Sequence, residues 1–121
     1  MQCPNLFFRD PISQQKLTHL LITGGWDRLT EAIPPTLEAQ IAQAFDNIEH
    51  TLQLSGSKGW SEVYSVRCYT TKVEEEELGL IAKYLKQYCP DHAPILTGVA
   101  VGGLFEGMLV EIEVSAHVRG E

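Results

Sequence analysis

The sequence lacks a cysteine pattern that would support disulfides or zinc. It has three cysteines, Cys3, Cys68 and Cys89, an odd number without a Cys-x-x-Cys pair. Such spacing argues against a disulfide framework and against a structural zinc site. The histidines show no His-Glu-x-x-His spacing, so the sequence predicts no bound metal. We therefore expect reduced thiols, as in a cytoplasmic protein.

Long apolar segments are missing as well. No run approaches the roughly 18 residues that a membrane-spanning helix needs. The first residues, MQCPNLFFRDP, also lack the basic and apolar regions of a secretory signal. Both features predict a cytoplasmic protein without membrane contact.

Basic residues are scarce. The chain has 9 Lys and Arg against 16 Asp and Glu, which gives a net charge of −7. The arginines are scattered and form no stripe that could displace counterions from a phosphate backbone. We therefore expect no nucleic-acid partner.

What the chain does contain is sufficient for a globular core. Its 121 residues fit a single domain, which we assign to residues 1–121. A chain of this length can bury a core without disulfides or metals. Hydrophobic residues make up 44% and charged residues 21%, which are ordinary values for a soluble globular protein.

The most regular pattern lies in residues 36–56. Apolar side chains recur there at helical spacing. Thr36 is the predicted N-cap, and Gly56 is the predicted C-terminal stop. The predicted buried stripe consists of Leu37, Ile41, Ala44, Ile48 and Leu52.

Residues 74–88 predict a second helix. Acidic residues lead and lysines trail, as the helix dipole favours. We expect the run Glu74–Glu77 to be solvated. The predicted inner stripe consists of Leu78, Ile81, Ala82 and Leu85.

Alternating segments predict strands at residues 17–23, 61–71, 95–103 and 108–117. Two helices and a mixed sheet make an α+β layer with both helices on one sheet face. The other face would then expose enough aliphatic surface to favour association of subunits. Its predicted residues are Thr97, Val99, Val101, Leu109, Glu111 and Glu113.

The last strand, LVEIEVSAHV, raises a separate question. It sets Glu111 and Glu113 opposite Val110, Ile112 and Val114. The two carboxylates could lie on an ordinary solvated face, or they could line a pocket at a subunit boundary. The alternation alone leaves both interpretations open.

Several segments, taken in order, resemble one family. QIAQAFDNIEHTLQLSGSKGWSEVYSVRCYTT, PDHAPILTGVAVGG and MLVEIEVSAHV are similar to the Rid family of YjgF-type reactive-intermediate deaminases, long labelled L-PSP endoribonucleases. GGWD at 24–27, KGWSEVYSVRCY at 58–69 and PDH at 90–92 resemble its fungal branch. The resemblance covers residues 12–118, nearly the whole chain.

The resemblance implies a chorismate-mutase-like fold and a homotrimer, with sheets lining a central barrel and clefts between subunits. Active members hydrolyse imines and enamines, such as 2-iminobutanoate and 2-iminopropanoate, to keto acids and ammonia. They use no metal or organic cofactor. An arginine holds the substrate carboxylate bidentately. A glutamate in the last strand handles the attacking water, and backbone groups after an early Ser-Gly complete the site.

Carried onto this chain, the family glutamate falls on Glu111, which becomes the candidate catalytic residue. The arginine position falls on Leu96, which cannot bind a carboxylate. The implied substrate-binding positions are Leu96 with its neighbour Thr97, and Thr23 with Gly24 in place of Ser-Gly. The loop TGGWD is shorter than the SGQGGWD of fungal relatives.

Three functions follow, in order of preference. The first is a Rid-type enzyme whose cleft, made apolar by Leu96, acts on a less acidic imine, enamine or secondary-metabolite intermediate through Glu111. The second is a noncatalytic trimer that binds a small molecule or a protein. The third is ribonuclease activity, which the net charge of −7 and the lack of a suitably spaced His/Lys pair disfavour.

Overall fold

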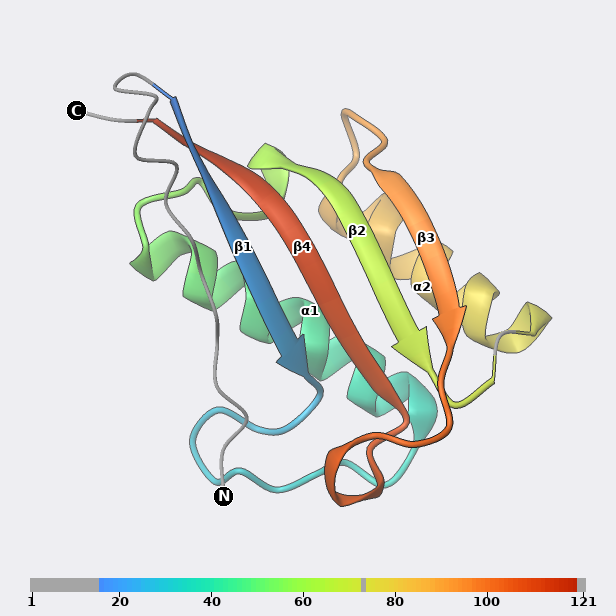
Figure 1. Ribbon diagram of the computed structural model, residues 1–121. Coiled ribbons are helices and arrows are strands. Elements are labelled where there is room, and N and C mark those ends of the chain that lie inside the picture. The colour runs from blue at the N-terminus through green and yellow to red at the C-terminus, as the bar shows by residue number, and fades with distance from the viewer. Residues whose placement is uncertain (1–15, 73, 120–121) are drawn as a thin grey trace.

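The computed structural model describes residues 16–72 and 74–119. The prediction for the Cys3 thiol lies outside these residues. Four strands form one sheet, and two helices lie together on one face of it (Figure 1). The strands are β1 (Lys16–Gly24), β2 (Val63–Thr70), β3 (Ile95–Ala100) and β4 (Val110–Arg119), and the helices are α1 (Leu37–Leu54) and α2 (Glu75–Tyr88).

The strands lie in the order β1-β4-β2-β3. β4 pairs antiparallel with both β1 and β2, whereas β2 and β3 pair in parallel. A parallel pair needs a long crossover, and α2 supplies it between β2 and β3. The predicted α+β layer, with a mixed sheet and both helices on one face, is confirmed.

Both predicted ends of α1 are confirmed. The side chain of Thr36 accepts a hydrogen bond from the Ala39 amide at 3.2 Å. The helix ends at Leu54, and Gly56 follows with a φ of +96°, in the left-handed region that glycine adopts readily. The predicted stripe faces the core, where Phe45 also stacks on Trp60 with ring centroids 4.6 Å apart.

The inner face of α2 differs from the prediction. Ile81 is buried as expected, and Leu85 packs on the core, but Leu78 and Ala82 are exposed. The helix is rotated so that Glu77 is buried instead, because its carboxylate caps the helix by accepting from the Glu74 amide at 3.2 Å. The prediction that this whole acidic run is solvated is therefore wrong at Glu77.

β2 contains an irregularity that its alternation does not reveal. The pairing with β4 shifts between Val63 and Ser65, so Val63 and Val66 are both buried although they are three residues apart. A strict alternation over this strand predicts Tyr64 on the same face as Val66 and Cys68, but Tyr64 leaves that face and stacks on His117 with centroids 4.5 Å apart. From Ser65 to Thr70 the alternation is regular, with Val66, Cys68 and Thr70 buried.

The two faces of the sheet have different surroundings. The face toward α1 and α2 is the core, and we call it the covered face. The opposite face, which we call the open face, carries no helix within the described part of the chain (Figure 1). No described helix is long and apolar enough to cross a membrane. The residues that β4 gives to the covered face are Val110, Ile112, Val114, Ala116 and Val118.

Candidate functional site

Glu111 lies near the start of β4, on the open face. Its neighbours in sequence, Val110 and Ile112, are fully buried on the covered face, so alternation turns the Glu111 carboxylate the other way. The side chain is half-buried although no helix covers it. Among the described residues, its cross-strand neighbours are Gly24 on β1 and Tyr69 on β2.

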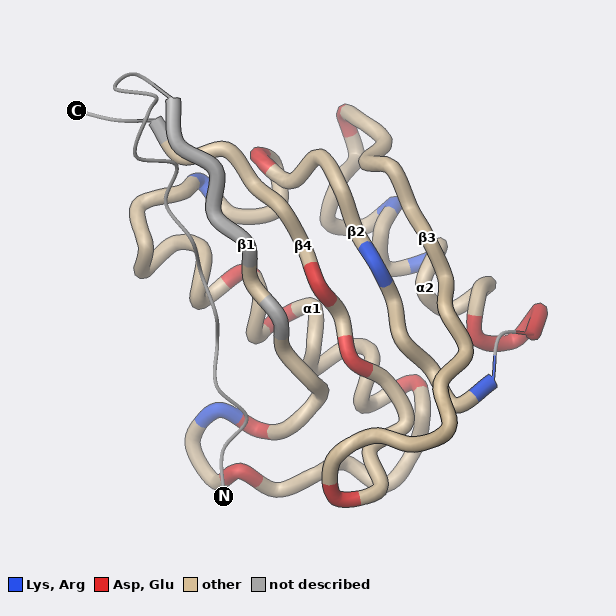
Figure 2. The backbone as a smooth tube through the Cα atoms, in the orientation of Figure 1, with Lys and Arg blue, Asp and Glu red and all other residues tan. Residues whose placement is uncertain are grey.

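A second carboxylate lies two residues further along the same face. Glu113 accepts a hydrogen bond from the Tyr69 hydroxyl at 2.6 Å. It also pairs with Arg67, whose Nη1 lies 3.6 Å from Glu113 Oε2. Figure 2 shows the acidic segment of β4 beside the basic segment of β2. Glu113 is thus occupied by two partners.

Glu111 is in a different electrostatic state. Burial raises the pKa of the Glu111 carboxyl above its ordinary value, and the negative charge of Glu113 raises it further. The pKa of Tyr69 is also raised, first by its hydrogen bond to Glu113 and then by burial. A carboxyl shifted toward neutrality is better suited to give and take protons than an ordinary surface glutamate.

The predicted positions Thr23 and Gly24 end β1 beside Glu111, but only one of them faces it. Thr23 is buried on the covered face, opposite Ile112, and its hydroxyl donates to the Gly24 carbonyl at 3.2 Å. Gly24 pairs with Glu111 itself. Asn47 fixes the following turn by donating to the carbonyls of Gly24 at 3.1 Å and Trp26 at 2.7 Å.

Leu96 and Thr97 lie on opposite faces of β3. Thr97 pairs with Arg67 and so shares the open face with the two glutamates. Leu96 pairs with Val66, which places it on the covered face, where it is 38% exposed at the outer strand. Within one subunit, therefore, Leu96 and Glu111 are separated by the sheet.

Arg67 and Tyr69 were missed as site candidates from the sequence. Their alternation on β2 is visible in the sequence, but the register that brings them opposite Glu113 and Glu111 is not. The described thiols take no part: Cys68 is buried on the covered face, and burial raises its pKa to about 12. Among the described residues, no three His, Cys, Asp or Glu side chains converge as metal ligands do.

Comparisons with known proteins agree on the fold. RidA from the Antarctic bacterium Psychrobacter sp. PAMC 21119 is 20% identical, with a TM-score of 0.77 over 91% of this chain and 85% of that chain. YyfB of the conserved Rid protein family from Yersinia pestis is 22% identical, with a TM-score of 0.73 over 88% and 81%. The yeast protein YEO7 is 17% identical, with a TM-score of 0.74 over 91% and 89%.

A search of curated proteins gives no match. The sequence model of the family described as endoribonuclease L-PSP matches residues 14–118, which is most of the chain. The chain therefore belongs to the endoribonuclease L-PSP family, also called Rid.

Proposed function

We propose that this protein is a Rid-type small-molecule enzyme that acts on an imine, an enamine or a related secondary-metabolite intermediate of low acidity. The observation that carries the proposal is Glu111, a half-buried carboxyl with a raised pKa on an open sheet face. A pKa shift of this kind, caused by burial and a like charge, is typical of acid–base residues. The fungal character of GGWD and KGWSEVYSVRCY is part of the same proposal.

The proposed reaction is hydrolysis. Water adds to the imine carbon while Glu111 takes a proton from the water and returns one to the nitrogen. In the second step Glu111 takes the proton of the carbinolamine hydroxyl and gives one to the nitrogen, the carbon–nitrogen bond breaks, and ammonia leaves as the carbonyl group forms. No net proton is gained or lost by Glu111 in either step, so one carboxyl can serve both.

The proposed cleft lies between subunits of a homotrimer in the cytoplasm. Glu111 and Leu96 are on opposite faces of one sheet, so a cleft that contains both must take them from two subunits. Ile95 on the outer strand β3 is 70% exposed, which supports contact with another copy at this edge. Sedimentation should give three times the 13.5 kDa of one chain, and a monomer would contradict the cleft.

The charges near Glu111 favour a substrate of low acidity. Position 96 offers a leucine, and the guanidinium that the structure describes beside Glu111 and Glu113, that of Arg67, already pairs with Glu113. A substrate carboxylate would meet net negative charge. We therefore expect little ammonia release from 2-iminobutanoate or 2-iminopropanoate, and more from neutral imines generated in situ. The same charges oppose binding of RNA phosphates.

The decisive variant is Glu111→Gln, which keeps volume and hydrogen bonding but cannot accept a proton. It should abolish ammonia release from neutral imines while the oligomeric state stays unchanged. Glu113→Gln is the matched control and should retain most of the activity, because this carboxylate is occupied by Tyr69 and Arg67. Full activity in Glu111→Gln would remove the assigned role.

The alternative is a noncatalytic trimer that binds a small molecule or a protein. The inward-turned hydroxyl of Thr23 favours it, because this side chain cannot contact a ligand on the open face. Under this alternative, wild-type protein releases no ammonia from any imine, and Glu111→Gln changes only ligand affinity.

A further inference from the structure

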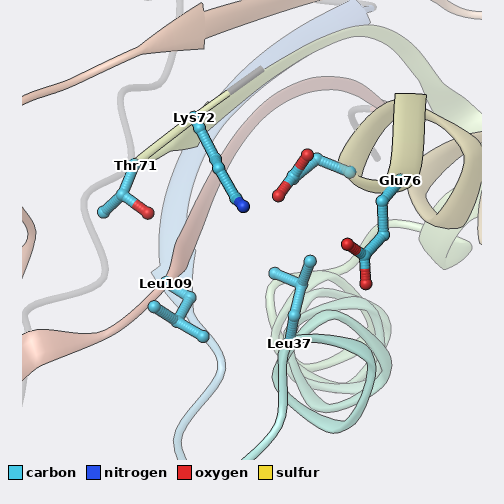
Figure 3. Close-up of a pocket in the computed structure, with 6 residues that line it drawn as sticks. Leu37, Thr71, Lys72, Glu76 and Leu109 are labelled. Atoms are coloured by element: carbon cyan, nitrogen blue, oxygen red, sulfur yellow. The ribbon is translucent and has the colours of Figure 1, made fainter. Parts of the chain in front are cut away.

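A separate pocket lies at the end of the sheet where β2 leads into α2. It has a volume of about 220 Å³ and is lined by the residues drawn in Figure 3. Drug-sized ligands occupy about 300–1,000 Å³, so this pocket suits a smaller metabolite. Its lining comes from α1, from the β2–α2 connection, from α2 and from the start of β4: Leu37, Thr71, Lys72, Glu76, Glu77 and Leu109.

The walls of the pocket are held in place by hydrogen bonds. The Thr70 hydroxyl donates to the Lys72 carbonyl at 2.6 Å, which fixes the turn that carries Lys72. The Leu109 amide donates to the side chain of Gln40 at 2.8 Å, which ties the start of β4 to α1. Such preorganisation lowers the entropy cost of binding a ligand.

The polar groups of the pocket have both signs of charge. Lys72 extends into it and forms no ion pair with any residue that the structure describes (Figure 3). Glu76 is exposed at the start of α2, whereas Glu77 is only 3% exposed. One Glu77 oxygen caps α2, and the other has no hydrogen-bond partner within residues 16–72 and 74–119. This second oxygen is not fully buried, so it can accept a hydrogen bond from water or from a donor on a ligand.

These groups select among ligand classes. A simple carboxylate would satisfy Lys72 but would meet two like charges at Glu76 and Glu77. A simple amine would satisfy the glutamates but would face the ammonium of Lys72. A ligand with both groups satisfies all three, and a short aliphatic chain would cover Leu37 and Leu109.

We propose that this pocket binds a free aliphatic α-amino acid. The ligand carboxylate bonds Lys72, its ammonium bonds Glu76 and the second oxygen of Glu77, and its side chain packs on Leu37 and Leu109. The pocket is distinct from the Glu111 site and goes beyond the proposed reaction. Because Leu109 lies two residues before Glu111 on the way into β4, an occupied pocket also borders the candidate catalytic strand.

The test is a titration of the ¹⁵N-labelled full chain with L-leucine, followed by NMR. Saturable shifts are expected at the amides of Thr71, Lys72 and Leu109. Two analogues separate the polar contacts: 4-methylpentanoate lacks the amine, and 3-methylbutylamine lacks the carboxylate. Each should bind at least about tenfold more weakly, since a charged hydrogen bond contributes a factor of that size.

Two substitutions assign the contacts to residues. Lys72→Met should weaken leucine binding at least about tenfold but should not weaken the amine, which gains from the loss of a like charge, and Glu76→Gln should weaken both ligands. Neither residue takes part in the Glu77 cap. Lys86→Met and Glu75→Gln, on the same helix but outside the pocket, are the matched controls and should bind like the wild type.

Failure of this proposal is distinguishable from failure of the proposed reaction. Glu111→Gln should bind leucine normally whatever its effect on imine hydrolysis. The absence of saturable shifts at about 10 mM leucine, tenfold above a millimolar Kd, would overturn the pocket assignment. If 3-methylbutylamine bound as tightly as leucine, the assigned ligand class would be wrong. The same holds if the control variants Lys86→Met and Glu75→Gln bound leucine as weakly as Lys72→Met.

Discussion

On the covered face, β4 presents Val110, Ile112 and Val114, whereas the same strand presents Glu111 and Glu113 on the open face. The covered residues are held by burial against α1 and α2, which stabilises the fold whichever ligand the protein binds. The open carboxylates gain little from folding, and burial disfavours the charge of Glu111. The covered residues of β4 are therefore needed for stability, whereas the carboxylates on its open face are not. Variants on the covered face should accordingly lose more stability than variants on the open face.

The largest effect should come from Phe45→Ala, which removes an α1 ring from the core that lies against the covered face. Phe45 is fully buried and stacks on Trp60, so the substitution leaves a cavity. We expect the free energy of unfolding to fall by about 3–5 kcal/mol. Urea unfolding followed by circular dichroism measures the change. Thr97→Ala on the open face is the control and should stay within about 0.5 kcal/mol of the wild type. Equal losses of unfolding free energy in Phe45→Ala and Thr97→Ala would mean that the two faces contribute equally to stability.

Asn47→Ala tests the connection between the two faces. Asn47 is buried under the sheet, yet its amide holds the carbonyls of Gly24 and Trp26, in the turn beside Glu111. Losing both hydrogen bonds removes the Asn47 donor from the Trp26 carbonyl and one of two side-chain donors from the Gly24 carbonyl, which should cost about 1–3 kcal/mol of unfolding free energy.

The matched control for Asn47 is Gln43→Ala on the same helix, since Gln43 bonds only the Asn47 side chain. Hydrogen exchange should show faster opening at residues 24–26 in Asn47→Ala than in this control. Unchanged exchange there would mean that the turn is held by other contacts.

Glu111→Gln should change how stability depends on pH. Because burial raises the folded pKa above the ordinary 4.5, the folded protein binds more protons than the unfolded chain between the two values. The free energy of unfolding of the wild type should therefore fall as pH rises through this window. Glu111→Gln should lack this decline. Its free energy of unfolding should therefore exceed that of the wild type above the folded pKa, and the difference should disappear below pH 4.5.

Urea titrations at fixed protein concentration across this pH range measure the effect. Glu106→Gln, in the exposed loop before β4, is the control. Parallel stability curves for wild type and Glu111→Gln would show that the open face imposes no electrostatic cost at this position.

The smallest effect should come from Arg67→Gln. The Arg67 side chain is 55% exposed and its ion pair with Glu113 spans 3.6 Å, so the loss should be less than about 1 kcal/mol and should shrink further in salt. A thermal melt at low and high ionic strength measures it. A larger, salt-independent loss would mean that the open face contributes to folding as the covered face does.

Local patterns in the sequence were enough to predict the two layers. The period of α1, its Thr36 cap and the alternation that turns Glu111 away from the core all depend on residues close together in the chain. The pairing of Arg67 with Glu113 depends on a β2–β4 register that spans a whole helix and a strand, and a shift at Val63 changes its phase. Such contacts carry no local signal.

The prediction that Glu77 is solvated was wrong for a different reason. An acidic run at a helix start is typical of solvated surface, and nothing in the run marks which member turns inward. Its burial follows from the cap that it makes with Glu74, together with the position of α2 on the sheet. The pocket beside Lys72 was therefore invisible in the sequence, although all its polar residues are close together there.

β3 is the outermost strand beyond β2, and its Ile95 and Leu96 side chains are substantially exposed. Along its free side, the backbone groups have no neighbouring strand within the described sheet. An apolar edge of this kind can template the addition of another chain, native or not. A freshly made subunit therefore has two competing outcomes, ordered assembly with its own copies or irreversible aggregation. We expect a Lys or Pro substitution at Ile95 to improve the solubility of the isolated chain while weakening its assembly.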